Sequence, residues 1–106
     1  RMNSDEKFLG YYLAGIPVAA LSYKREGAEM RILRMLLEPK HFRKGIAINL
    51  LEFLARKEKE VETFAISTQA ANGPAIRLYE KLGFSFIDET VVDTGLRLAH
   101  LKRHIV

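Results

Sequence analysis

Tyr79 is the side chain of this 106-residue chain that is best suited to chemistry. It lies near the end of a segment in which apolar residues recur at i, i+3, i+4 and i+7, the pattern of one helix face. Asn72 or Gly73 can cap the start of that helix, and Gly83 can end it in a left-handed conformation. The aliphatic residues of this face are expected in the core. A phenol held near the helix end, however, can donate a proton to a departing group.

A second segment combines positive charge with small residues at the expected start of another helix. Lys40, Arg43 and Lys44 supply the charge, and Gly45 and Ala47 allow a ligand to approach the backbone closely. A helix that begins near Gly45 directs unpaired N–H groups and its positive dipole end outward, which suits a phosphate. Taken alone, the segment is at least as typical of a solvated basic loop before an ordinary helix.

Together the two segments resemble the signature motifs of the GNAT superfamily of acyl-CoA-dependent N-acyltransferases. Nine residues match the family's C-terminal signature helix in register: Asn72, Ala75, Leu78, Tyr79, Glu80, Lys81, Leu82, Gly83 and Phe84. The family's phosphate-binding motif, Gln/Arg-x-x-Gly-x-Gly/Ala, is matched at Gly45 and Ala47, whereas Phe42 stands where Gln or Arg is expected. This departure affects a side-chain contact and leaves the backbone contacts in place.

The resemblance implies an N-acetyltransferase that moves an acetyl group from acetyl-CoA to a primary amine, by direct attack of the amine on the thioester. It implies a coenzyme A site made by Leu36, Leu37, Arg43, Lys44, Gly45, Ile46, Ala47, Asn72, Tyr79 and Lys81. In this site a backbone N–H near Leu36 or Leu37 would stabilise the thioester oxygen, and Tyr79 would protonate the departing thiolate. The alternative is a catalytically inactive domain of the same fold that senses the cofactor or mediates an interaction.

The base that removes the proton from the amine stays open. Its candidates, each also typical of an exposed or paired structural residue, are Glu29, Glu38, Asp88, Glu89 and His100. His100 and His104 are not expected to bind a metal, because the chain has no cysteine and the spacing offers no third ligand. Amino acids, peptides, polyamines and amino sugars all stay open as acceptors.

Composition favours a single-domain globular protein. The chain is 48% hydrophobic and 28% charged, and no apolar run approaches the ~20 residues of a membrane-spanning helix. No leader segment is visible, so a cytoplasmic location is expected. The net charge of +4 does not predict nucleic-acid binding, because Glu58, Glu60 and Glu62 interrupt the basic residues. We therefore expect neither a membrane nor a nucleic acid as partner.

Periodicity predicts the elements that would position these motifs. Strands are expected over 7–13, 18–24, 29–37, 62–68, 84–89 and 96–105, with a bulge near 34–36 and a hairpin turn at 14–15. The helix over 45–59 is expected to bury Ile48, Leu51, Leu54 and Ala55. A strand–helix–strand step through this helix requires parallel neighbours. The fold class is therefore α+β, a mixed and mostly antiparallel sheet with helices packed on its faces. In the GNAT superfamily, the parallel pair splays apart to admit the pantetheine arm.

Members of the superfamily usually carry a further strand and two helices before the first strand expected here. We therefore expect residues 1–106 to form one domain, either a fragment of a longer chain or a short variant. A short variant would take part of its acceptor site from an adjoining domain or a second copy.

Overall fold

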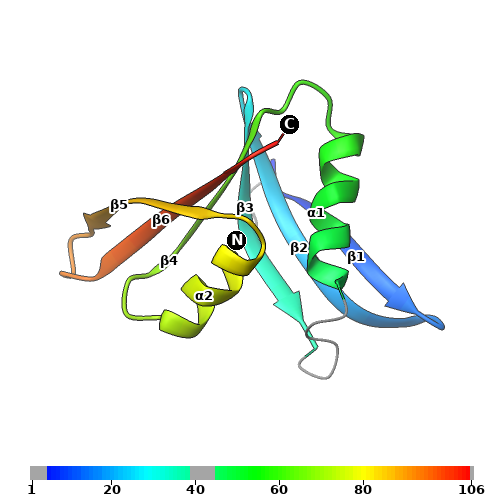
Figure 1. The fold of residues 1–106 in the computed structure, drawn as a ribbon, viewed down its shortest axis with the longest axis horizontal. Helices are drawn as coiled ribbons and strands as arrows, with labels where there is room; N and C mark the ends of the chain where they lie inside the picture. Colours follow the sequence, from blue (N-terminus) through cyan, green and yellow to red (C-terminus); the bar gives the residue numbers. More distant parts are fainter. Residues whose placement is uncertain (1–4, 39–44, 106) are drawn as a thin grey trace.

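The computed structural model describes residues 5–38 and 45–105 of the chain. Three strands, a helix, a strand, a second helix and two strands follow one another (Figure 1). They are β1 (Lys7–Leu13), β2 (Ile16–Glu26), β3 (Glu29–Leu37), α1 (Ile46–Lys57), β4 (Thr63–Gln69), α2 (Gly73–Lys81), β5 (Ser85–Val91) and β6 (Arg97–His104). This is the order of elements that the sequence predicts.

The six strands form one sheet in the order β1-β2-β3-β4-β6-β5. Among the described strands, only β3 and β4 are parallel neighbours, and the segment with α1 connects them, whereas the other four pairings are antiparallel. The expected mixed, mostly antiparallel α+β fold is therefore confirmed.

The parallel pairing of β3 with β4 is short. It joins Glu29–Ile32 to Thr63–Ile66, although β3 continues to Leu37 and β4 to Gln69. Past these four pairs the two strands diverge, and the sheet opens into a V (Figure 1). The last part of β3 therefore keeps β2 as its neighbour but has no ladder with β4.

A bulge lies where β3 leaves β4. On β2, Ser22 pairs with Arg34 while Tyr23 pairs with Ile32, so Leu33 is the extra residue of β3. A bulge bends a strand and increases its twist, which directs the end of β3 away from β4. The bulge predicted near 34–36 is thus found in the expected strand, one residue earlier.

The hairpin between β1 and β2 has its turn at the expected place, but β2 begins earlier than predicted. Ala14 and Gly15 have φ values of 52° and 80°, as a two-residue hairpin turn of type I′ requires. The strand includes Ile16 and Pro17, although it was expected to begin at residue 18. Pro17 pairs with Tyr12 beside a register shift, and the pairing of β2 with β3 begins only at Ala19, so its missing N–H is tolerated.

Both helices cover the same face of the sheet and share one core with it (Figure 1). The helix α1 contributes Ile46, Ala47, Leu50, Leu51 and Leu54, all of them buried. Leu82, which follows α2, and Phe84 are also buried in this core. The helices therefore stand side by side over the point where the sheet opens.

The ends of α2 follow the capping rules that the sequence suggests. Asn72 Oδ1 accepts a hydrogen bond from the Ala75 N–H at 3.2 Å, so Asn72 is the N-cap. At the other end, Phe84 N–H donates to Tyr79 O and Gly83 N–H donates to Glu80 O, each at 3.0 Å. These two bonds make a Schellman motif around Gly83, whose φ is 96°.

Candidate active site

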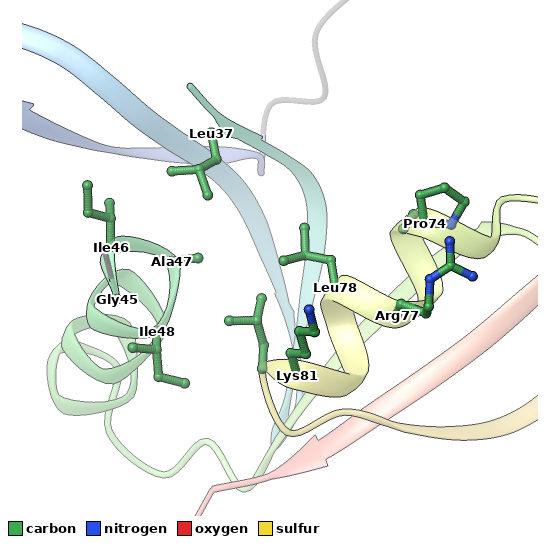
Figure 2. Close-up of a pocket in the computed structure, with 11 residues that line it drawn as sticks. Leu37, Gly45, Ile46, Ala47, Ile48, Pro74, Arg77, Leu78 and Lys81 are labelled. Carbon is green, nitrogen blue, oxygen red and sulfur yellow. The ribbon is translucent and has the colours of Figure 1, made fainter. Parts of the chain in front are cut away.

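A cleft of about 650 Å³ lies between the start of α1 and one side of α2. Its walls are formed by Leu37, Gly45, Ile46, Ala47, Ile48, Pro74, Ala75, Arg77, Leu78, Lys81 and Leu82. Figure 2 shows Ala47 and Ile48 of α1 facing Leu78 and Lys81 of α2, with Leu37 of β3 between the helices. We call it the interhelical cleft; its lining is mainly apolar.

The start of α1 forms one wall of the cleft with backbone N–H groups. Gly45 is the N-cap at φ 75° and ψ 10°, and within the described residues no side chain caps the helix. Since the first intrahelical bond runs from Asn49 N–H to Gly45 O, the N–H groups of residues 46–48 have no partner inside the helix. The first turn contains no acidic residue. This wall of the cleft is therefore suited to an anion.

The facing side of α2 supplies positive side chains. Arg77 and Lys81 are four residues apart, and hence lie one turn apart on the same side of the helix (Figure 2). Leu78 lies between them in sequence and points into the cleft. The cleft thus combines an uncapped helix start, two cations and an apolar interior, a setting for a ligand that carries both phosphates and an uncharged chain.

Tyr79 lies at the border of the cleft rather than in its lining. Because successive residues of a helix are rotated by 100°, Tyr79 lies next to Ala75 around α2, just outside the part of the helix surface that lines the cleft. There it packs against the core. Its ring is partly buried, 6.2 Å from the ring of Phe84, and its hydroxyl has no hydrogen-bond partner within the described residues. Burial raises the pKa of Tyr79 above its ordinary value of 10.0. The phenol is therefore protonated at neutral pH.

The structure brings about half of the expected coenzyme A residues together. Those that line the interhelical cleft are Leu37, Gly45, Ile46, Ala47 and Lys81. Leu36 is 68% exposed and, as the neighbour of Leu37 in a strand, points to the opposite face of the sheet. Asn72 caps α2 and does not line the cleft. Arg43 and Lys44 lie outside the described residues.

Two lining residues were not among those expected. Ile48 completes the first turn of α1, and Arg77 adds a cation one turn before Lys81. The spacing of Arg77 and Lys81 was a readable signal in the sequence, because residues four apart share a side of a helix.

Four of the five candidate bases lie on strands, whereas Glu38 follows the end of β3. Glu29 forms an ion pair with Lys102 at 2.9 Å, and Glu89 forms one with Arg97 at 2.8 Å. His100 is hydrogen-bonded through both ring nitrogens. In residues 5–38 and 45–105, no three His, Asp or Glu side chains gather as metal ligands, and no helix there is long and apolar enough to cross a membrane.

Comparison with known proteins gives a consistent result. The model of a family described as "Acetyltransferase (GNAT) domain" matches residues 1–105. The Bacillus subtilis (strain 168) protein "UPF0157 protein YqkA" is 32% identical over 96 residues, and the match covers 91% of this chain and 28% of that protein. The chain thus spans little more than a quarter of this curated relative.

Solved structures share the fold at low sequence identity. Nourseothricin acetyltransferase has a TM-score of 0.78 at 14% identity, over 95% of this chain and 66% of that one. The PaiA N-acetyltransferase of Thermoplasma acidophilum, solved with coenzyme A, has a TM-score of 0.75 at 21% identity, over 95% and 62%. The ribosomal-protein-S18-alanine N-acetyltransferase of Escherichia coli has 0.73 at 22% identity, over 98% and 72%.

Proposed function

Because the chain belongs to the GNAT acetyltransferase family, we propose that it transfers an acetyl group from acetyl-CoA to a primary amine of a small molecule or peptide. Acetyl transfer in general follows from the family. The donor, the acceptor class and the residues named below are the specific content of the proposal.

The observation that carries the proposal is the composition of the interhelical cleft. Coenzyme A joins a diphosphate and a further phosphate to a long uncharged arm that ends in sulfur. The unpaired N–H groups at the start of α1 suit the diphosphate, and the apolar lining suits the arm. Arg77 and Lys81 are available to the remaining negative charge. A fold neighbour solved with coenzyme A supports this choice of ligand.

The reaction needs a donor for the thioester oxygen and an acid for the departing sulfur. Beyond Ile32, β3 has no ladder with β4, so we assign the oxyanion contact to a backbone N–H near Leu36 or Leu37. We assign Tyr79 to protonation of the thiolate, because its phenol is protonated and has no other partner in the described part of the chain. The contacts of Arg43 and Lys44 with the diphosphate, and that of Asn72 with the arm, stay predictions.

The acceptor is proposed only as an amine. Fold neighbours include a spermidine N-acetyltransferase from Vibrio cholerae and the S18-alanine enzyme, so proteins of this fold are named for chemically different acceptors. We further propose that an adjoining domain or a second copy completes the acceptor site. That residues 1–106 form one domain, and that the protein is cytoplasmic, stay predictions.

Calorimetric titration of acetyl-CoA tests the donor, and a free-thiol release assay tests the transfer. The amine panel contains spermidine, lysine, glucosamine and a peptide that begins with alanine. We expect saturable heat and thiol release with at least one amine. No heat with a folded sample would overturn the coenzyme A site, whereas binding without release for any amine would overturn the transfer.

A further inference from the structure

A cluster of polar side chains lies on the face of the sheet opposite the helices. Ala99 and Leu101 of β6 are buried in the core at 1% and 0% exposure, so His100 between them points to the opposite face. There it contacts Ser67 of β4 and Thr90 of β5, and Arg31 of β3 reaches the same serine. Four strands therefore contribute one side chain each.

The distances describe a connected chain of hydrogen bonds. His100 Nδ1 lies 2.7 Å from Ser67 Oγ, and His100 Nε2 lies 2.8 Å from Thr90 Oγ1. Arg31 Nη1 donates to Ser67 Oγ at 3.3 Å. Ser67 and His100 are partly buried, whereas Thr90 is exposed. These hydrogen bonds therefore connect the partly buried serine to a residue at the protein surface.

One order of donors in this hydrogen-bond network suits proton transfer to His100. Arginine can only donate, so Ser67 Oγ accepts from Arg31 and has its own proton available for His100. When this proton is donated to His100 Nδ1, the ring proton lies on Nε2, which donates to Thr90 Oγ1. A neutral imidazole in this form can still gain one proton, at Nδ1.

Ser67 also stands where the sheet opens. Ile32 and Ile66 are the last pair that joins β3 to β4, and Ser67 is the next residue of β4. On β3, Leu37 lies past the same point and lines the interhelical cleft. Because no ladder joins the strands there, an acyl group held in the cleft and directed between them would meet an acceptor beside Ser67.

We propose that Ser67 and His100 form a proton relay for the acceptor amine, and this inference rests on the proposed function. Ser67 is the residue that contacts the amine. His100 acts through Ser67 and receives the proton, and Thr90 holds the imidazole in the receptive tautomer.

The relay balances the protons of the reaction. The ammonium passes one proton to Ser67 Oγ while the serine's own proton moves to His100 Nδ1. The resulting imidazolium releases its Nε2 proton to solvent beside the exposed Thr90, and exchange of ring protons with solvent returns His100 to the Nε2–H form before the next turnover. The neutral amine nitrogen then bonds to the thioester carbon, and the carbon–sulfur bond breaks. After the bond forms, the nitrogen loses a second proton. This proton balances the one that Tyr79 gives to the thiolate.

Charged groups surround His100 on three strands. Asp88 of β5 is its direct cross-strand partner, and Lys102 follows two residues along β6. Glu29 of β3 pairs with Lys102 at 2.9 Å and with Arg31 at 3.5 Å. These charges are unchanged in the variants chosen below, so differences in pH dependence report on His100 itself.

The variants are His100→Asn, Ser67→Ala and Ser67→Thr, with His104→Asn as matched control. Asparagine keeps an acceptor oxygen for Ser67 but cannot take up a proton. His104 lies on the same strand, and its partner Thr63, 3.5 Å away, is in the paired part of β4. The measurements are kcat across pH with the most active amine of the panel, and calorimetric affinity for acetyl-CoA.

We expect His100→Asn and Ser67→Ala to lower kcat by about 100-fold or more, as loss of a general base does. The dependence of kcat on pH should differ between His100→Asn and His104→Asn. Ser67→Thr should restore most of kcat because it keeps the hydroxyl, and His104→Asn should match the unmodified protein. Affinity for acetyl-CoA should stay unchanged in all four. Equal kcat in His100→Asn and His104→Asn, or an inactive Ser67→Thr variant that binds acetyl-CoA normally, would overturn the relay.

A spectroscopic measurement separates the relay from the proposed function. Long-range proton–nitrogen correlation spectra of the protein without substrate report the tautomer of His100. The relay requires the proton on Nε2, with Nδ1 as acceptor, and a proton on Nδ1 would overturn it even if the enzyme is active. Failure of acetyl-CoA to bind would instead overturn the proposed function.

Discussion

At the level of single residues, the position of the Tyr79 ring affects both the pKa and the hydrogen bonding of its hydroxyl. The ring packs beside Phe84 and is partly withdrawn from water, which raises the pKa of the phenol. The same packing leaves the hydroxyl without a hydrogen bond in the described part of the chain. An acid must be protonated at the working pH and be available to the leaving group, and Tyr79 meets the first condition because the ordinary pKa of a phenol is 10.0 and burial raises it further.

Replacing Tyr79 by phenylalanine should lower kcat by about 100-fold, as loss of a general acid does, with little change in affinity for acetyl-CoA. Since the pKa of Tyr79 is raised above 10.0, the phenol stays protonated as pH rises to that value. The midpoint of the alkaline loss of kcat due to Tyr79 should therefore lie above pH 10.0, and this loss should be absent in the variant. Full kcat in Tyr79→Phe would show that another group protonates the thiolate.

Arg77 and Lys81 allow a second prediction at this scale. The double variant Arg77→Ala/Lys81→Ala should weaken acetyl-CoA binding by about tenfold, or ~1.4 kcal/mol, because two charge-assisted contacts are lost. The loss should shrink as salt is added, since both side chains are exposed. Calorimetry at two salt concentrations measures it. Arg56→Ala, at the far end of α1, is the control, and an equal loss there would mean that only net charge matters.

At the level of elements, the end of α2 depends on one glycine. Gly83 has φ 96°, and a Cβ there would lie 3.2 Å from Arg103 Cδ. Arg103 in turn forms an ion pair with Glu52 of α1 at 2.6 Å. The turn after α2 is therefore packed against the side chain that connects β6 to α1.

Substituting Gly83 by alanine should cost about 1–2 kcal/mol for the left-handed backbone, and more for displacing Arg103. Gly95→Ala is the matched control, because Gly95 has a similar φ of 85° and nothing within 4 Å of the Cβ position. Thermal denaturation should show a larger loss for Gly83→Ala. Equal losses would show that Arg103 moves aside without cost.

Local sequence signals predicted the elements well where one signal dominates. The bounds 29–37 of β3 are reproduced because alternation and flanking turns agree, and the Asn72 and Gly83 signals locate both ends of α2. The buried side of α1 was less well predicted. Ile48 and Ala55 are only partly buried, whereas Ile46, Ala47 and Leu50 are buried. Ile48 lines the interhelical cleft instead of packing in the core.

The parts of the site that depend on strand register could not be predicted in this way. The contacts of His100 with Ser67 and Thr90 join residues 33 and 10 positions away. Nothing in the spacing of these residues indicates that they meet, because cross-strand partners are set by pairing and bulges. The broken alternation of β3 predicted a bulge, but it did not predict that the extra residue is Leu33, where β3 leaves β4.

At the level of the whole molecule, the interhelical cleft is lined by residues from both halves of the fold. The lining residues 37 and 45–48 come from the half that contains β1–β3 and α1, whereas the lining residues of α2, together with Leu82, come from the half with β4–β6. In the sheet, the halves are joined by only the four pairs of β3 and β4. A ligand in the cleft would therefore connect the halves at the side where the sheet is open.

Acetyl-CoA should consequently stabilise the folded state, and it should protect the residues on both sides of the cleft. At a concentration of about 100 times Kd, mass action predicts ~2.7 kcal/mol of added stability, measurable as a rise in Tm. Hydrogen exchange should slow at residues 46–48, in α2 and along 33–37, and change little in β1. The Arg77→Ala/Lys81→Ala variant at the same ligand concentration is the control and should show weaker protection. Protection confined to one half would mean that the ligand does not bridge the helices, and would remove the physical basis for placing it in the cleft.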